Sequence, residues 1–516
     1  MNPDVWGFDI WRSVLFINRF ISEEHHFQRM HNRKQPDLRA IADRAMEKYG
    51  FNPSFPKKVL REVRDLLEWS PNGEKTDVVD LRNILWVSID NHDTMDIDQI
   101  QFCKEEADNE IHVKVAIADV DLLVKKGSPI DRHAVKHGTS IYTGVVTYPM
   151  LPVRLSEDIT SLHPNHVRMA VVIEYTVLQD GSTRPGNIYP AIVQNQAKLV
   201  YEVVGEWLEE RNAFPYDSLK IPELADQLLL QHEAAERMKE QRAKQGFLDL
   251  LTIEASPVMD GGNVTGLVVQ KESPAHSLIE EFMIAANRTL VNHLKDASYP
   301  MVQRIVRTPR NWDGIIEEAA SRHMKLPKDP DAQALAGFLL SQKKADPESF
   351  PDLSLTIVKL MGPGEYVGIA PGEDSVGHFA LAVTDYTHGT APNRRYVDII
   401  IQRLIKAVVA TQPSPYGIDE LVMLADHLSA TEKAAKKVER FMIKAAAAVL
   451  LRDRIGEEFR AIVTGAADKG TYARIIDPPV EGRIVRNEKG LKVGNKILVR
   501  LLNTDPEQGF IDLERI

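Results

Sequence analysis

The order of strand-like and helix-like segments constrains the fold of this chain more than any other feature. Residues 111–117 alternate, with Ile111, Val113 and Val115 on one face, which predicts a β-strand. Two more strands are expected at 84–89 and 168–178, and helices are expected later, at 222–245, 276–296, 394–411 and 419–453. Strands that precede helices, without regular alternation, favour an α+β domain over a repeating βαβ fold.

The N-terminal segment has a different pattern, because amphipathic stretches predict helices at 11–27, 37–49 and 56–69. Three short helices with a glycine-containing turn fit a helix-turn-helix module. They also fit a helical lid that packs on the next domain, and the sequence leaves both interpretations open.

The C-terminal segment changes character again. Five short strand-like segments are expected at 459–464, 470–476, 482–485, 496–501 and 510–513, and Gly or Pro turns separate most of them. Five strands in so short a segment fit a small OB-type barrel. The expected organisation is therefore an α+β multidomain protein: a helical domain at 1–75, an α+β domain at 76–455 and an OB-type β-barrel at 456–516.

Composition excludes several classes of protein. The single cysteine, Cys103, rules out an intramolecular disulfide and a zinc site built from cysteines. The formal charge of −11 argues against a uniformly basic nucleic-acid surface, but it is compatible with a local basic channel. No apolar run is long enough for a transmembrane helix, and the short stretch Val14–Ile17 lacks the features of a signal peptide. A cytoplasmic protein without membrane contact is expected.

The segment Asp90–Asp98 carries four carboxylates in nine residues. Such crowded like charges are costly unless a cation lies among them, and a hard cation with oxygen ligands is the natural candidate. Asp96 and Asp98 are two residues apart, so an extended chain points them to the same side. An EF-hand loop is excluded because Met95 occupies the glycine position. A catalytic metal site and a solvated acidic turn both remain open.

A second cluster, Tyr386–Asp398, carries groups suited to phosphate. Pro392 followed by a helical pattern predicts the start of a helix, and helix N-termini bind anions. The adjacent Arg394 and Arg395 add bidentate phosphate donors. The alternative is a capped helix with solvated arginines. Carboxylates for a metal combined with arginines for phosphate favour phosphodiester cleavage over a calcium-stabilised structural domain.

Several short motifs accompany these two clusters in a fixed order. They are Asp90–Gln99, Gly138–Tyr142, Pro149–Pro152, Leu155-Ser156, Ser161-Leu162, Ala197–Tyr201, Ala275–Glu281, Ala286-Asn287, His378-Phe379 and Arg394–Tyr396. In this order they resemble the RNB catalytic domain of the RNase II and RNase R family of exoribonucleases, over about 80–450. The tail 456–516 resembles the RNA-binding OB domain that ends these enzymes, with Tyr472, Arg474, Arg483 and Arg486 near its expected binding face.

The resemblance implies an activity and roles for single residues. The family cleaves single-stranded RNA from the 3′ end, releases 5′-mononucleotides and uses Mg²⁺, for which Mn²⁺ is a substitute. Asp90, Asp96 and Asp98 would hold the metal and orient the attacking water, and Arg394 would bind the scissile phosphate or the leaving oxygen. The expected RNA contacts are Tyr142 as a stacking platform and Tyr201 and Glu281 at the terminal nucleotide, with Glu280, Arg395 and His388 as further candidates.

Three departures from the family pattern qualify this prediction. The fourth family aspartate is Gln99, an uncharged amide, which predicts weaker metal binding. The family's Ser-Pro-Ile-Arg reads Ala391–Arg394, and Leu250 replaces a stacking aromatic, with Phe247 nearby. The alternative is therefore an RNB-fold RNA-binding or regulatory protein that is catalytically weak or inactive, against which the retained aspartates and arginine argue. A regulator that contacts duplex DNA through residues 1–75 is a third hypothesis.

Overall fold

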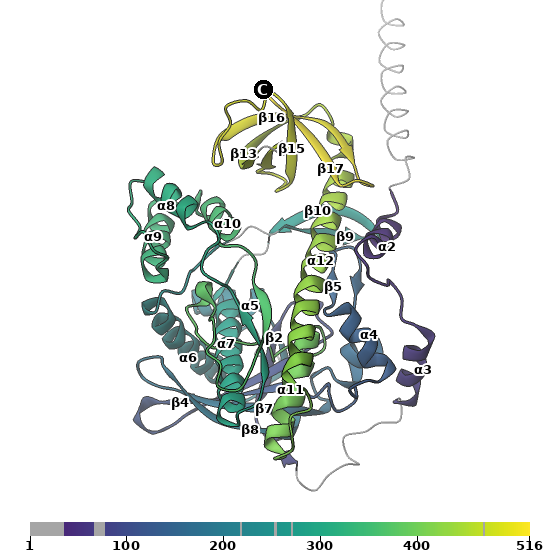
Figure 1. The fold of residues 1–516 in the computed structure, drawn as a ribbon, viewed down its shortest axis with the longest axis vertical. Coiled ribbons are helices and arrows are strands. Elements are labelled where there is room, and N and C mark those ends of the chain that lie inside the picture. The colour runs from purple at the N-terminus through teal and green to yellow at the C-terminus, as the bar shows by residue number, and fades with distance from the viewer. Residues whose placement is uncertain (1–35, 67–77, 217–218, 252–254, 270–271, 468–469) are drawn as a thin grey trace, which may run out of the picture.

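The computed structural model describes residues 36–66, 78–216, 219–251, 255–269, 272–467 and 470–516. A mixed helix and strand body carries a small β-barrel at one end, and one long helix, α12 (Ile418–Leu450), runs from the body to the barrel (Figure 1). The prediction of an α+β fold with a C-terminal barrel is confirmed. None of the helices in these ranges combines the length and the hydrophobicity required to cross a bilayer.

The central sheet has six strands in the order β1-β8-β2-β3-β4-β7, and β7 also pairs with β8. The strands are β1 (Val79–Asp80), β2 (Trp86–Asp90), β3 (Gln99–Glu105), β4 (Ile111–Ala118), β7 (Val167–Val177) and β8 (Thr183–Val200). β1 and β2 run parallel to β8, and the other pairs are antiparallel. The three predicted strands are confirmed, whereas β3 and β8 were not predicted. Pro185 and Pro190 hide β8, because proline reads as a strand breaker.

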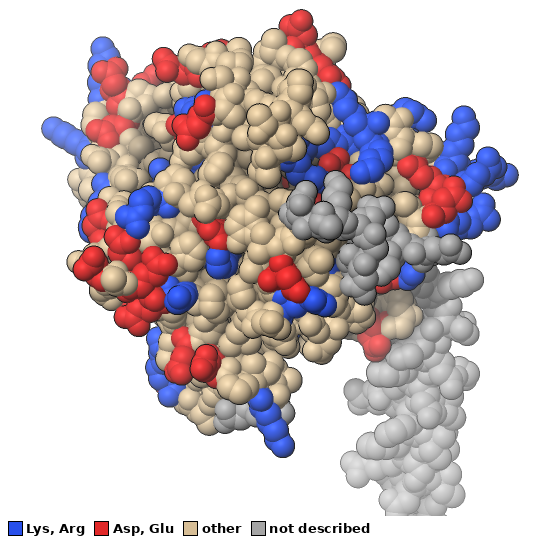
Figure 2. Space-filling model, turned by 90° about the horizontal axis from the view of Figure 1, so that it is seen from below, with Lys and Arg blue, Asp and Glu red and all other residues tan. Residues whose placement is uncertain are grey.

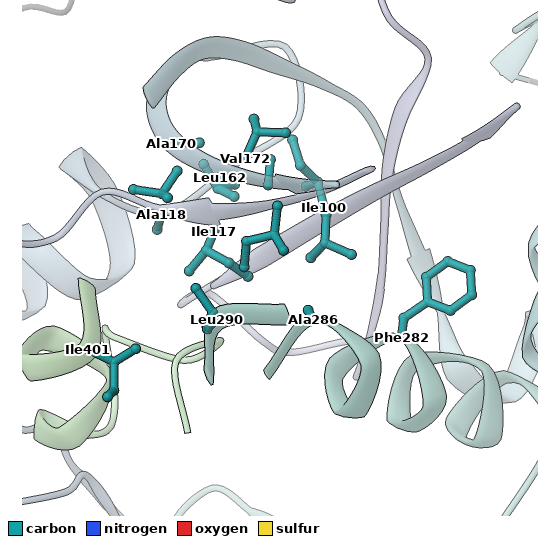
Figure 3. Packing of buried hydrophobic residues seen from close by; sticks show 14 of the residues in the cluster. Ile100, Ile117, Ala118, Leu162, Ala170, Val172, Phe282, Ala286, Leu290 and Ile401 are labelled. Atoms are coloured by element: carbon teal, nitrogen blue, oxygen red, sulfur yellow. The ribbon is translucent and has the colours of Figure 1, made fainter. Parts of the chain in front are cut away.

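Helices cover the sheet and form the main core with it. The helices of this part are α4 (Pro129–His137), α5 (Tyr201–Glu210), α6 (Leu224–Lys244), α7 (Pro274–Asp296) and α11 (Tyr396–Val409). Figure 3 shows Ala286 and Leu290 of α7 lying against Ile117 and Ile100 of the sheet, in a single buried cluster that also includes Ile401 of α11. The cluster fixes α7 and α11 relative to the ends of the strands, where the acidic segment lies.

The helix α12 joins three hydrophobic cores. Its first turns contribute Leu421 and Leu428 to the main core, its middle packs against α2 (Leu38–Lys48), and its Ala447 and Ala448 enter the barrel core. At 1.5 Å per residue, its 33 residues span about 50 Å. The barrel is therefore attached to the body by a continuous helix.

The described N-terminal helices, α2 and α3 (Lys57–Asp65), pack on the body. α2 buries Ile41 and Met46 against α12, and α3 buries Val59 and Val63 in the main core beside α4. This packing fits the helical-lid interpretation of residues 36–66. The predicted helix 11–27 and the predicted domain boundary at 75 lie outside the described residues, and the hypothesis of DNA contact stays a prediction.

The C-terminal barrel is closed, in the strand order β13-β14-β15-β17-β16. Its strands are β13 (Glu458–Ala467), β14 (Gly470–Ile475), β15 (Glu481–Arg486), β16 (Lys496–Asp505) and β17 (Phe510–Arg515). The five predicted strands are confirmed. Arg474 was expected near the binding face, but its Nη2 pairs with Oδ1 of Asp352 at 2.7 Å on α10 (Phe350–Met361), so it joins the barrel to the body.

The remaining elements were not predicted, and neither were β1, α4 and α5. The remaining elements are β5 (Ile141–Tyr142), β6 (Thr147–Tyr148), β9 (Ala255–Asp260), β10 (Asn263–Val269), β11 (Met301–Ile305), α8 (Trp312–Ser321), α9 (Ala332–Ala345) and β12 (Glu365–Ile369), together with α10. α8, α9 and α10 share a small core of their own.

Candidate active site

Three of the four aspartates in the acidic segment are candidate metal ligands, and the segment lies where β2 ends and β3 begins. Asp90 is the last residue of β2, and Asp98 directly precedes β3. The amide of Ala118 donates to the carbonyl of Asp98 over 2.9 Å, which ties this end of the loop to β4. Only 2% of Asp98 is exposed, and burial raises the pKa of its carboxyl well above the ordinary value. Burial also raises the pKa of Asp90.

The turn that contains Arg394 contacts the buried carboxylate of Asp98. The amide of Asn393 donates to Oδ1 of Asp98 over 2.8 Å, and Nε of Arg394 lies 3.5 Å from Oδ2. Asn393 is itself fully buried, and its Oδ1 accepts from the hydroxyl of Thr160 at 2.6 Å. The departure Ala391–Arg394 therefore supplies a polar anchor for the turn. The two clusters predicted from the sequence do meet in space.

Each carboxylate is held by a donor on one oxygen. Oδ1 of Asp90 accepts from the hydroxyl of Thr94 at 2.8 Å, and Oδ2 of Asp96 accepts from the hydroxyl of Tyr142 at 2.9 Å. Oδ2 of Asp98 is buried without a hydrogen-bond partner among the described residues. Carboxylate oxygens are the ligands that Mg²⁺ and Mn²⁺ prefer, so this donor set fits such a cation. In the described ranges, no three carboxylate, imidazole or thiol groups are already gathered around one point.

The helix α11 begins at Tyr396, so Pro392 lies in the turn before it and not at the predicted helix start. The chain's own groups occupy this helix end. The amide of Tyr396 donates to the carbonyl of Gly138 over 2.9 Å, and the buried Asp398 accepts from Ala391 and from Nη2 of Arg395. Arg395 is thus engaged in a buried ion pair, whereas the side chain of Arg394 is 46% exposed. Of these two arginines, Arg394 is the one open to a phosphate.

A cavity of about 250 Å³ next to this turn brings together four of the predicted residues, Tyr142, His388, Arg394 and Arg395. Tyr142 is 41% exposed. His388 is half-buried against Tyr366, whose hydroxyl lies 2.9 Å from its Nδ1, and desolvation lowers the pKa of His388 well below its ordinary value. His388 is therefore a neutral wall of the cavity.

The same cavity has a wall that the sequence did not reveal. Glu432, Lys436 and Glu439 of α12 line it. Their spacing places them on one face of a helix. That periodicity is the feature of the sequence from which this wall of the cavity could have been predicted. Glu439 accepts from the backbone amide of Tyr142 over 3.1 Å, so α12 helps to place the tyrosine.

The two residues predicted at the terminal nucleotide have different surroundings. Tyr201, the first residue of α5, stacks on His276 with ring centroids 4.1 Å apart. Burial and the charge of Asp90 raise the pKa of Tyr201, whereas the charge of Arg394 opposes this shift. His276 was not predicted as a partner of Tyr201. It belongs to the Ala275–Glu281 motif, and that motif is the feature of the sequence that could have indicated it.

Glu281 lies apart from the carboxylate cluster. It is 2% exposed and accepts from Nε of Arg242 at 2.8 Å, beside a separate cavity of about 100 Å³. Glu280 is half exposed, 3.3 Å from Nη2 of the same arginine. Among the described residues, the structure connects Glu281 to Arg242 and not to the aspartates. Its role at a nucleotide stays a prediction.

The remaining departures are also resolved in space. Leu250 packs beside the core of α8, α9 and α10, and Phe247 lies under the guanidinium of Arg242, 3.9 Å from its ring centroid. Leu250 has no aromatic ring and the ring of Phe247 is covered by Arg242, so neither side chain offers a base a free aromatic surface. Gln99 begins β3, with its backbone paired to Ile117. The side-chain amide of Gln99 makes no hydrogen bond to another described residue.

Charges of both signs lie on the face of the body that Figure 2 shows. Figure 2 shows the face seen from below, where acidic and basic side chains alternate without a broad basic area among the described residues. This agrees with the formal charge of −11. A chain with this net charge has no general attraction for a polyanion, so local groups such as Arg394 have to supply it.

The family model of the RNB domain matches residues 78–411, which contain both clusters of the site. The chain belongs to the RNB family. A second family model, the RNase II-type exonuclease C-terminal S1 domain, matches residues 457–516, the described barrel. The resemblance seen in the motifs is confirmed, and the expectation of an exoribonuclease is confirmed at the level of the family.

Ribonuclease R proteins are among the relatives of this RNB protein. That of Aquifex aeolicus is 28% identical over 92% of this chain and 70% of its own length. That of Thermotoga maritima is 30% identical over 89% of this chain and 68% of its own length. The fold is similar to Mycoplasma genitalium RNase R in complex with ribose-methylated single-stranded RNA, with a TM-score of 0.83 and 23% identity over 93% of this chain and 78% of that one.

Proposed function

We propose that this chain hydrolyses single-stranded RNA from the 3′ end and releases 5′-mononucleotides, with Mg²⁺ or Mn²⁺ as cofactor. One observation carries the proposal: the buried Oδ2 of Asp98 has no hydrogen-bond partner among the described residues and lies 3.5 Å from Nε of Arg394. An oxygen suited to a cation is thus adjacent to a donor suited to a phosphate. Membership of the RNB family and the RNA complex of the Mycoplasma relative support RNA as the substrate.

The chemistry that a divalent cation supplies at such carboxylates is activation of a water molecule and neutralisation of phosphate charge. Asp98 is oriented for this task by the amide of Asn393, and Asp90 by the hydroxyl of Thr94. Arg394 has guanidinium donors left for an oxygen of the scissile phosphate. The exposed ring of Tyr142 offers a platform for a base, and stacking accepts every base because each has a π-face.

The alternative, a non-catalytic RNA-binding protein, rests on Gln99. An amide in that position removes one negative charge but leaves the buried carboxylate of Asp98 and the adjacent Arg394 in place. A buried carboxylate without a full set of donors is costly to maintain. This arrangement favours a working site over a vestigial one.

The test is incubation of the purified protein with 5′-labelled single-stranded RNA, with and without Mg²⁺. We expect shortening from the 3′ end only with the metal. Asp98→Asn should lower the cleavage rate by about 100-fold and keep RNA affinity, because it removes a ligand charge and changes no exposed surface.

The matched control is Asp93→Asn. Asp93 lies in the same loop but is exposed, so its replacement should leave the rate unchanged. Cleavage that persists in EDTA, or equal rates for Asp98→Asn and the parent, would contradict the proposal. If no variant cuts under any metal but RNA still binds, the non-catalytic alternative replaces it.

A further inference from the structure

Tyr142 has two parts with different surroundings. Its ring is exposed along the cavity beside Arg394, whereas its hydroxyl donates to Oδ2 of Asp96 over 2.9 Å. Its backbone is fixed as well, because its amide donates to Glu439 of α12 over 3.1 Å. The side chain therefore bridges the surface expected to carry RNA and one carboxylate of the acidic segment.

Asp96 depends on this bridge more than its neighbours depend on theirs. Asp90 receives two donors from its own loop, the hydroxyl of Thr94 and the amide of Asn91, both at 2.8 Å. Asp98 is enclosed and receives the amide of Asn393. The hydrogen bond that fixes Asp96 comes from a side chain 46 residues away.

We propose that Tyr142 is a positioning residue for Asp96, in addition to its role as a platform, and that its hydroxyl sets the affinity of the carboxylate cluster for a divalent cation. This inference rests on the proposed function of the same carboxylates. Metal-binding carboxylates are oriented by hydrogen bonds from outside the metal's own ligands, and loss of such a bond costs about 10- to 100-fold in metal affinity.

The arrangement also couples the metal to RNA. A base stacked on the ring restricts its movement and so keeps the hydroxyl on Asp96. RNA should therefore raise the affinity for the cation, and by linkage the cation should raise the affinity for RNA by the same factor. Tyr142→Phe should remove this mutual effect while it keeps the stacking surface.

The decisive measurement is Mn²⁺ binding to the 516-residue chain without RNA, followed by electron paramagnetic resonance. Tyr142→Phe should raise the Kd for Mn²⁺ by about 10- to 100-fold. RNA affinity in EDTA should be unchanged, because the ring remains. The cleavage rate of this variant should return to that of the parent at saturating Mn²⁺, which a misfolded variant would not do.

The matched control is Tyr148→Phe in the same β5–β6 hairpin. The hydroxyl of Tyr148 donates to Asp43 over 2.6 Å, away from the acidic segment, so its loss should leave Mn²⁺ affinity unchanged. Equal or tighter Mn²⁺ binding by Tyr142→Phe would overturn the inference. That result needs no cleavage assay, so it is distinct from failure of the proposed function, which Asp98→Asn tests.

Discussion

A pair of buried histidines should make the attachment of the N-terminal helices sensitive to acid. His133 and His137 lie one turn apart on α4 with ring centroids 4.3 Å apart, and they are 7% and 2% exposed. Phe55 and Phe51, between α2 and α3, pack on these two rings at 4.8 and 5.7 Å. Burial, together with the charge of Lys136, lowers the pKa of His133 to about 4 and that of His137 to about 3.

The direction of the effect follows from these pKa values. The unfolded chain takes up a proton on each imidazole near pH 6.5, whereas the folded chain does not until pH 4 or below. The free energy of unfolding therefore falls as the pH drops below about 6.5. A pH of 5 is about 1.5 units below the ordinary pKa of each imidazole, and each unit is worth about 1.4 kcal/mol. The two histidines together therefore lower the free energy of unfolding at pH 5 by about 4 kcal/mol.

Urea unfolding at pH 8 and pH 5 measures this cost. The double variant His133→Phe/His137→Phe should lose about 4 kcal/mol less than the parent between the two pH values, whatever its absolute stability. The control His166→Gln replaces an exposed histidine and should behave like the parent. An equal pH dependence for the parent and the double variant would refute the reasoning, because the protons would then be taken up elsewhere.

Three more predictions concern the metal and the barrel. Gln99→Asp should lower the Mg²⁺ concentration for half-maximal cleavage. A further negative charge near the cation is worth on the order of 4 kcal/mol at a dielectric of about 20. An unchanged or higher Mg²⁺ requirement would contradict the charge argument. Replacing the exposed Arg483 and Arg486 by Ala should weaken RNA binding and reduce the salt slope by about 1.4, as for two phosphate contacts on a single strand. Arg474→Ala should instead lower stability, since Arg474 pairs with Asp352, and an unchanged salt slope for the double variant would contradict the placement of RNA on the barrel.

Elements with strong local signals could be predicted from the sequence. α7 and α12 have long helical periodicity, and the barrel strands are separated by turn residues, so each appears near its predicted position. β8 could not be predicted, because its two prolines read as strand breakers; among the described strands both pair with β7 alone, since β1 and β2 meet β8 only from residue 191 on, so the missing N–H groups are tolerated on the free edge. α8, α9 and α10 were missed although their apolar faces form a real core, since no motif drew attention to them.

The chemical character of the site could be predicted, but the partners of its residues could not. The complementarity of acidic segment and arginine turn is a property of composition, and the structure confirms that they meet at Asp98. The partner of Glu281, in contrast, could not be predicted from the sequence. The ion pair of Glu281 with Arg242 joins α7 to α6 across 39 residues, and nothing in the local sequence of either helix indicates it.

The three carboxylates show how far local sequence determines such a site. The donor to Asp90 is Thr94, four residues away, and a turn of that length is readable in the sequence. The donors to Asp96 and Asp98 lie 46 and 295 residues away, on a hairpin and on the turn before α11. The identity of the ligand set is therefore local, whereas the orientation of two of its three members depends on the tertiary fold. Substitutions that remove the hydroxyl of Tyr142 or displace the amide of Asn393 should change metal affinity although they leave the acidic segment intact.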